Sequence, residues 1–257
     1  MGTLPGERNV STDVDNTQAT LQELRARASR VRLWMAGTIA FLVVLLATTW
    51  GGYTLFAGLA KATASTCFIM VAVTNRATAT RYGQLILAGL VLSWFGDVFL
   101  IGRGPALFLS GLVSFLLAHV AYTAAFIVHG IRLRWSAMAA LALAPIIFFV
   151  LRWLLPHVGD DMKIAVLTYM VVITLMVMFS WGARGAGLHR SAPIGAMMFF
   201  VSDLAVTRNR FVVPESLDWL WGLPLYYIAQ LFLAYSVVTV IRGQSEAVED
   251  GGSEGVH

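Results

Sequence analysis

Apolar runs that are long enough to cross a membrane follow one another along most of this chain. A transmembrane helix needs about 20 predominantly apolar residues, so each run predicts one crossing. Charged residues make up only 12% of the chain, about half the fraction that is usual in soluble domains. The sequence therefore predicts an all-α fold, a polytopic membrane helix bundle of about eight transmembrane helices, in a single transmembrane domain at 33–241. The expected helices cover residues 33–50, 53–74, 83–101, 106–129, 135–155, 163–181, 192–207 and 219–241.

The two ends of the chain differ in composition from this apolar part. Residues 1–32 are polar and close with a cluster of arginines. We expect them to form a basic N-terminal tail that is mobile, with a short surface helix near its end. Residues 242–257 are acidic and contain Gly and Ser, a composition that is typical of disordered segments.

Most of the arginines fall on the side of the membrane that holds the N-terminus, if successive helices alternate in direction. Cytoplasmic segments carry the excess of Lys and Arg, so both termini are expected in the cytoplasm. The expected location is the inner (plasma) membrane of a bacterium. The net charge of +4 comes mainly from these arginines, which suits contact with a lipid bilayer and predicts no nucleic-acid partner.

Two carboxylates lie within the apolar runs, Asp97 in LSWFGDVFL (92–100) and Asp203 in MMFFVSDLAV (197–206). Ionisable groups in a membrane span are costly and often mark a functional site. Two carboxylates in one low-dielectric cavity cannot both ionise freely, which leaves an acid beside a carboxylate. Such a pair suits hydrolysis through an oxocarbenium-like cation, where one group donates a proton and the other stabilises the cation or activates water.

The direction of each helix places further polar residues near the depth of these aspartates. Asp97 and Asp203 come late in helices that run away from the N-terminal side, whereas Lys61 comes early in a helix that returns. Residues that share a depth can line one cavity, so we expect both aspartates to face a common space. The candidate substrate-binding or supporting residues are Lys61, Ser93, His119, Tyr122, Tyr169, Ser202, Arg210, Tyr226, Tyr227 and Gln230.

A faint internal repeat supports the pairing of the two aspartates. An outward helix with an Asp, an Arg-bearing turn and an inward helix with polar and aromatic residues occur around 90–126 and again around 196–235. This pattern is consistent with two four-helix halves in parallel orientation.

Structural roles compete with these functional ones. The aspartates could form an interhelical hydrogen bond or an ion pair with Lys61, and the tyrosines could be packing or interfacial aromatics. Serines in membrane helices often serve close packing. No GxSxG motif is present, which disfavours a serine hydrolase. A zinc site could use Asp97, Asp203 and His119, but the other histidines lie at helix ends, in loops or in the tail. The second and third imidazoles of such a site are therefore missing, and neither metal nor cofactor is expected.

Several short motifs carry a resemblance to a known family. They are GAMMFFVSDLAVTRNRF (195–211), LPLYYIAQLFLAYS (223–236), GDVFL (96–100), AHVAY (118–122), Lys61, and Tyr169 with Met176. In this order and spacing, they make the chain similar to the YhhN-like lysoplasmalogenase family of integral membrane proteins over residues 55–240.

The resemblance implies an eight-helix bundle that hydrolyses the vinyl ether bond of lysoplasmalogens, which are lysophospholipids, to a fatty aldehyde and glycerophosphocholine or glycerophosphoethanolamine. Asp203 would then be the acid, Asp97 the stabilising or water-activating carboxylate, and Lys61 or Arg210 the phosphate contact. Another lysolipid or enol ether remains an alternative substrate. A proton-coupled transporter remains an alternative function, because paired intramembrane carboxylates suit it equally well, as does a metal-dependent lipid hydrolase of the ceramidase-like type.

Overall fold

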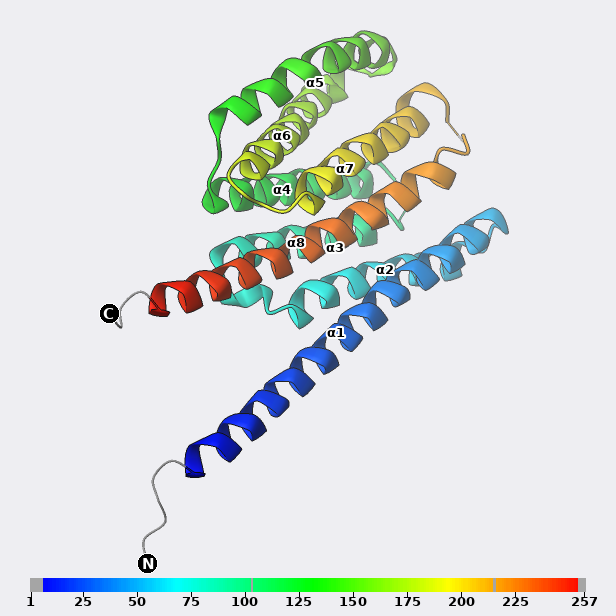
Figure 1. Ribbon diagram of the computed structural model, residues 1–257. Helices are drawn as coiled ribbons and strands as arrows, with labels where there is room; N and C mark the ends of the chain where they lie inside the picture. Colours follow the sequence, from blue (N-terminus) through cyan, green and yellow to red (C-terminus); the bar gives the residue numbers. More distant parts are fainter. Residues whose placement is uncertain (1–6, 103, 215, 254–257) are drawn as a thin grey trace, which may run out of the picture.

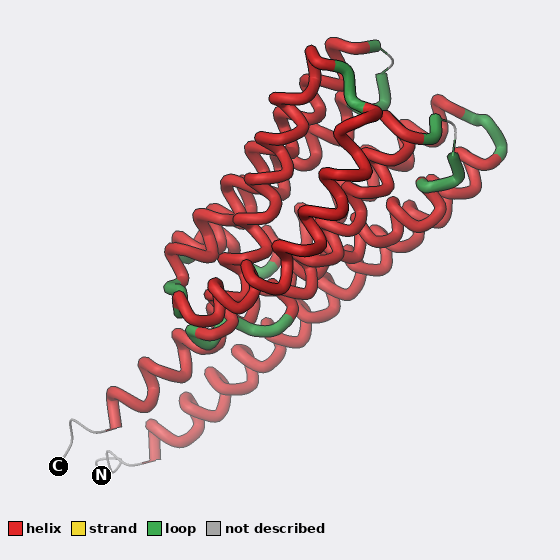
Figure 2. Tube along the Cα trace, turned by 90° about the horizontal axis from the view of Figure 1, so that it is seen from above, coloured by secondary structure: helices red, strands yellow, loops and turns green. Residues whose placement is uncertain are grey.

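The computed structural model describes residues 7–102, 104–214 and 216–253, and within these ranges all regular secondary structure is helical (Figures 1 and 2). The α-helices are α1 (Glu7–Trp50), α2 (Thr54–Thr74), α3 (Arg81–Phe99), α4 (Pro105–His129), α5 (Leu133–Leu154), α6 (Asp160–Gly185), α7 (Ser191–Thr207) and α8 (Trp219–Ser253). The short helical segments are η1 (Ala77–Ala79), η2 (Leu155–His157) and η3 (Arg208–Val212).

The helices form a membrane-spanning bundle. Seven of the described helices are long and apolar enough to cross a membrane. The remaining one, α7, has 17 residues and continues directly into the π-helical segment η3. The predicted all-α, polytopic membrane fold is therefore confirmed, and the protein is an integral membrane protein.

The N-terminal part of the chain differs from the expectation. A tail with only a short helix near its end is expected over 1–32, whereas the chain is helical from Glu7, and α1 enters the apolar span without a break. The physical reason is local: no Pro or Gly lies between Glu7 and Ala36, and many of these residues favour helix. An existing apolar helix extends into such a segment without a new nucleation step. Residues 1–6 lie outside the described residues.

The C-terminal part differs in the same way. Helix α8 continues through the segment expected to be disordered and ends at Ser253. Elongation of a formed helix again explains the difference, because the stretch SEAVED contains good helix formers next to an apolar span. The last four residues, 254–257, lie outside the described residues.

The helices pack side by side, and both ends of the described chain lie at the same end of the bundle (Figure 2). Helix α1 covers one edge against α2, whereas α5 and α6 form the opposite edge (Figure 1). Helix α8 packs on α2 and α3 as well as on α7. The helices of the two suggested halves therefore interleave in one bundle.

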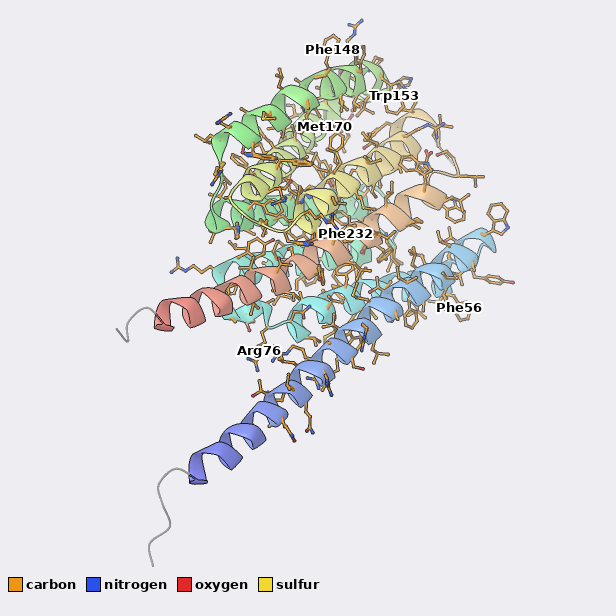
Figure 3. All side chains as sticks on the ribbon, in the orientation of Figure 1. Phe56, Arg76, Phe148, Trp153, Met170 and Phe232 are labelled. Carbon is orange, nitrogen blue, oxygen red and sulfur yellow. The ribbon has the colours of Figure 1, made fainter. Side chains whose placement is uncertain are left out.

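Large apolar side chains cover the outside of the bundle. Phe56, Phe148 and Trp153 point away from the helices (Figure 3) and are 60%, 60% and 39% exposed. Such a surface is unfavourable in water but suits contact with lipid chains. It agrees with a bundle that is surrounded by a bilayer.

Glycines let α3 approach α4 closely in the core. A Cβ atom on Gly89 would lie 2.3 Å from the ring of Tyr122, and one on Gly96 would lie 2.7 Å from the ring of Phe115. Small residues at helix contacts are the usual means of close packing in membranes. This close packing places Phe115 of α4 against Gly96, the residue before Asp97 on α3.

Candidate active site

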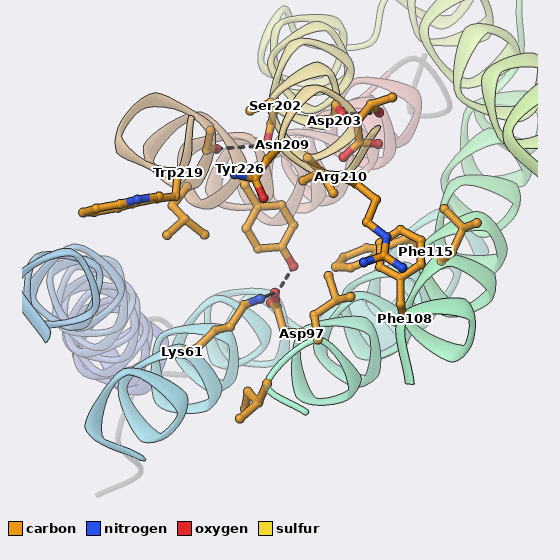
Figure 4. A pocket seen from close by; sticks show the side chains of 18 of the residues that line it. Lys61, Asp97, Phe108, Phe115, Ser202, Asp203, Asn209, Arg210, Trp219 and Tyr226 are labelled. Carbon is orange, nitrogen blue, oxygen red and sulfur yellow. Dashed lines mark hydrogen bonds and ion pairs between the residues drawn. The ribbon is translucent and has the colours of Figure 1, made fainter. Parts of the chain in front are cut away.

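A cavity of about 690 Å³ opens at the end of the bundle where α1 ends and α2 begins. Both aspartates line it, although they come from different helices, α3 and α7 (Figure 4). The shared cavity expected from helix direction is therefore present. Of the sequence-predicted residues, those that line it are Lys61, Asp97, Tyr169, Ser202, Asp203, Arg210 and Tyr226.

Asp97 is buried and fully engaged by hydrogen-bond donors. Its side chain is 2% exposed, and its Oδ1 lies 3.3 Å from the ammonium Nζ of Lys61. Its Oδ2 accepts hydrogen bonds from Ser65 Oγ at 2.6 Å and from Tyr226 Oη at 2.7 Å. A cation and two hydroxyl donors therefore offset part of the cost of burying a negative charge at this position.

Ser65 was missed by the sequence reasoning. It lies on α2 one helical turn after Lys61, so both side chains share a face of the helix. Its hydroxyl is also 3.3 Å from that of Tyr227, which in turn donates to the Lys61 carbonyl at 3.2 Å. A small hydroxyl residue four positions after an intramembrane lysine was the signal that could have found it.

Asp203 lies in a different environment, which α4, α6 and α7 build together. Its Oδ2 accepts a hydrogen bond from Tyr169 Oη at 2.7 Å and lies 3.3 Å from His119 Nε2. His119 Nε2 is also 2.9 Å from the Tyr169 hydroxyl. The Asp203 side chain is 17% exposed, whereas that of His119 is fully buried. Asp203 is thus the more accessible of the two carboxylates.

The tautomer of His119 follows from its neighbours. Its Nε2 faces a carboxylate and a hydroxyl oxygen, whereas its Nδ1 is buried without a hydrogen-bond partner among the described residues. A neutral ring therefore carries its proton on Nε2. The ring packs edge-on against Phe199, with 4.6 Å between ring centroids.

A polar layer lies behind the cavity wall. Tyr122 Oη donates to Gln230 Oε1 at 2.8 Å and lies 3.4 Å from Ser93 Oγ. All three side chains are fully buried. The sequence-predicted residues that do not line the cavity are Ser93, His119, Tyr122, Tyr227 and Gln230. Their side chains do not line the cavity, and their hydrogen bonds support its wall.

Ser202 and Arg210 occupy contrasting positions. The Ser202 hydroxyl donates to the Gly222 carbonyl at 2.9 Å, which ties α7 to α8 and fits a packing role. Arg210 lies in η3 at the rim of the cavity, where its guanidinium sits 4.4 Å from the ring centroid of Phe108 (Figure 4). Among the described side chains, no carboxylate forms an ion pair with it.

An ion pair that the sequence reasoning did not single out holds the loop after η3. Arg208 pairs with the buried Asp218, which also accepts hydrogen bonds from the Ser216 hydroxyl and the Trp221 indole. Burial acts to raise the pKa of Asp218, but the hydrogen bonds from Ser216, Arg208 and Trp221 and the charge of Arg208 outweigh it, so the pKa lies below its ordinary value. The loop that carries the cavity rim is thereby fixed.

The described residues contain no group of three or more His, Cys, Asp and Glu side chains that could hold a metal ion. What the cavity does offer is acid–base chemistry. It presents one carboxylate that is compensated by a lysine and a second, more accessible one that is held by a tyrosine and a histidine. These environments differ enough to divide a proton-donating and a charge-stabilising role between the two groups.

Comparison with known proteins places this chain in a family. The YhhN family model matches residues 55–237. Human lysoplasmalogenase TMEM86A is 32% identical over 162 residues, and the match covers 60% of this chain and 65% of the human protein. Bovine lysoplasmalogenase TMEM86A is 29% identical over 174 residues, with 64% and 68% covered.

Human lysoplasmalogenase TMEM86B is 32% identical over 157 residues, with 61% of this chain and 65% of that protein covered. The match thus spans just under two thirds of each human relative. No solved structure shows significant similarity to the chain. Because the family match runs from α2 into α8 and includes both cavity carboxylates, the chain belongs to the YhhN family.

Proposed function

We propose that this protein is a membrane hydrolase that cleaves the vinyl ether bond of lysoplasmalogens. The products are a fatty aldehyde and glycerophosphocholine or glycerophosphoethanolamine. One observation carries the proposal: two carboxylates in different environments line one cavity inside a membrane bundle. The names of the curated relatives support the same substrate class.

The reaction needs only acid–base chemistry. A proton adds to the vinyl carbon that is not bonded to oxygen, and the positive charge is shared between the other vinyl carbon and the ether oxygen. Water adds to that carbon and loses a proton, which gives a hemiacetal. The hemiacetal then breaks its bond to the glycerol oxygen, which leaves with a proton as the alcohol, and the aldehyde is released. The sum is one water consumed, with no oxidation or reduction.

Asp203 is the proposed acid. Both hydrogen-bonding contacts of its carboxyl group within the described chain fall on Oδ2, so Oδ1 is available to carry the proton that reaches the substrate. Tyr169 and His119 fix the plane of the carboxyl group and thereby aim Oδ1. A positioned acid of this kind typically contributes a factor of about 10² to 10⁴ in rate.

Asp97 is the proposed stabilising carboxylate. Asp97 lies on a different wall of the cavity from Asp203 (Figure 4), and in this proposal its contacts with Lys61, Ser65 and Tyr226 stabilise its ionised form. Negative charge that is fixed before the reaction stabilises a cation as it develops, and it does so most strongly where water is excluded. Proton removal from the attacking water is the second role open to this group.

Arg210 is the proposed phosphate contact. Lys61 already compensates Asp97, whereas Arg210 is exposed at the rim and its guanidinium can bind phosphate oxygens in pairs. The remaining cavity wall is largely apolar, with Leu45, Ala57 and Leu112 among its residues. This arrangement places the headgroup at the rim and the apolar chain against the helices.

The test is aldehyde release by the purified protein in detergent. A lysoplasmalogen is the substrate, and the ester-linked lysophospholipid with the same headgroup is the control. We expect activity that survives chelators and that falls at least about 100-fold in Asp97→Asn and in Asp203→Asn. Asp161→Asn, an exposed Asp outside the cavity, is the matched variant and keeps full activity. Full activity in either cavity variant contradicts the mechanism, and chelator sensitivity favours a metal-dependent lipid hydrolase.

A second candidate function is proton-coupled transport. The polar layer of Ser93, Tyr122 and Gln230 continues behind the carboxylates, as a proton path into the bundle would. This alternative predicts no hydrolysis of any lysolipid and a proton-dependent flux of solute in liposomes. Hydrolysis without such flux excludes it.

A further inference from the structure

A second recess lies at the other end of the bundle, where α4 and α6 end and α3 and α7 begin. Its volume is about 940 Å³. We call it the basic recess and define it by Thr80, Arg81, His129, Arg184, His189 and Arg190, all of which line it. None of these residues takes part in the chemistry proposed above.

The charge of the basic recess is one-sided. Arg81, Arg184 and Arg190 come from three different segments, and no Asp or Glu is among the lining residues. Among the described side chains, none of the three arginines forms an ion pair. The hydrogen bond of Arg184 to the Leu188 carbonyl is long, at 3.5 Å. Cations gathered in this way raise the local potential and attract an anion.

Backbone groups add to this field. Helix α3 begins in the wall of the recess, where Thr80 Oγ1 accepts a hydrogen bond from the Gly83 N–H at 3.0 Å and caps the helix. At the start of α7, the N–H groups of Ser191 and Ala192 already donate to His189, and Pro193 has no N–H. The three guanidinium groups are therefore the main donors for anionic oxygens, and the positive ends of the two helix dipoles add to their field.

The position of the recess suggests what the anion is. The recess lies at the end of the bundle from which both termini extend, which the excess of arginines predicts to be cytoplasmic. Basic pockets between membrane helices at that surface meet the phosphate groups of anionic lipids. We propose that the basic recess is an anion site that binds the phosphate group of an anionic phospholipid.

A neighbouring pair of arginines allows the basic recess to be compared with the general charge of this surface. Arg132 and Arg134, at the start of α5, line a recess that residues 132–138 alone form. A single segment cannot surround a ligand. The two positions therefore provide a control for charge at the same end of the bundle.

The experiment is a lipid titration of the full-length protein in detergent, followed by native mass spectrometry. Phosphatidylglycerol and phosphatidylcholine with identical acyl chains are compared, and inorganic pyrophosphate is the soluble competitor. The test variant is Arg184→Gln/Arg190→Gln, and its matched control is Arg132→Gln/Arg134→Gln. Arg210→Gln shows separately whether lipid bound in the cavity near α2 contributes to the signal.

We expect phosphatidylglycerol to bind more tightly than phosphatidylcholine and to be displaced by pyrophosphate. Each arginine near an anionic group contributes about a fivefold change in affinity, so the test variant weakens binding by roughly 25-fold. The matched control leaves it unchanged. The single variant Arg184→Gln, with a fivefold effect, serves if the double variant does not fold.

Two outcomes overturn the proposal: equal affinity for both lipids together with no binding of pyrophosphate, or an equal loss in the test variant and its matched control. If pyrophosphate binds through Arg184 and Arg190 but the two lipids do not differ, the site is confirmed and its ligand is a soluble phosphate. Hydrolysis is not measured in this experiment, so its result is independent of the proposed enzymatic function.

Discussion

Replacing Lys61 with Met removes the cation that compensates Asp97 while keeping a side chain of similar length. Lys61 Nζ lies 3.3 Å from Asp97 Oδ1, and the carboxylate is 2% exposed. At an effective dielectric constant of about 20, two unit charges at this separation attract each other by about 5 kcal/mol. Breaking a buried pair costs roughly 3–5 kcal/mol, because one charge stays buried without its partner.

The structure favours the lower end of that range. The Lys61 side chain is 15% exposed, and Asp97 keeps its hydrogen bonds from Ser65 and Tyr226. We therefore expect Lys61→Met to lower the free energy of unfolding by about 3 kcal/mol. In Lys61→Met/Asp97→Asn both charges of this pair are removed, so the double variant should regain at least half of that loss.

The assay is reversible unfolding in mixed micelles, followed by tryptophan fluorescence, for the wild type, both single variants and the double variant. These four proteins form a double-mutant cycle, which gives the coupling energy between the side chains of residues 61 and 97. Lys163→Met, which removes an exposed lysine paired with Asp160, is the control and should change stability by less than about 1 kcal/mol. A coupling energy near zero would refute the view that Lys61 holds Asp97 in its ionised form.

Three further predictions concern other parts of the bundle. Gly89→Ala places a methyl group against the Tyr122 ring, so thermal unfolding in detergent should show a loss of about 1–3 kcal/mol. Arg210→Gln should raise KM for a lysoplasmalogen at least about tenfold with a smaller change in kcat, because it removes a binding contact rather than a reacting group. The pKa of Asp218 is lower in the folded protein than its usual value of about 3.9. Its stabilising contribution is therefore complete above that value and is lost as the pH falls through the folded pKa. Acid unfolding should accordingly be less steep in Asp218→Asn.

The sequence predicted the helices well because a bilayer leaves few alternatives. Backbone polar groups must be satisfied inside each apolar segment, so apolar length alone indicates a helix. The helix from Glu7 differs from the tail expected at 1–32 because polarity indicates exposure, and an exposed segment can still be helical when it extends an existing helix. Composition alone does not distinguish a solvated helix from a tail.

The cavity could be predicted in part. Helix direction placed Asp97 and Asp203 at one depth, and the structure puts both on one cavity. Depth does not specify rotation about the helix axis, so it could not show which polar residues face the cavity and which lie behind its wall. Gln230 and Tyr122 share the depth but bond to each other behind it. Ser65 was missed because a serine among apolar residues resembles a packing residue until its partner is known.

The rim was the least predictable part. Arg208 and Asp218 are paired across a loop, and neither lies within an apolar run, so hydropathy gave no reason to connect them. Arg210 was a candidate from its position after Asp203, but its contact with Phe108 brings together residues from two distant helices. Contacts of this kind depend on how helices pack, which apolar length and helix direction do not determine.

The most direct test of the proposed chemistry is hydrolysis of a lysoplasmalogen in D₂O, with mass spectrometry of the aldehyde after immediate reductive trapping. Proton transfer from Asp203 to the vinyl carbon predicts one solvent deuterium at carbon 2 of the aldehyde released by the wild type. Asp203→Asn should release at most about one hundredth as much aldehyde. Aldehyde without deuterium at carbon 2, or undiminished release by Asp203→Asn, would contradict the assignment of the cavity to acid-catalysed vinyl ether hydrolysis.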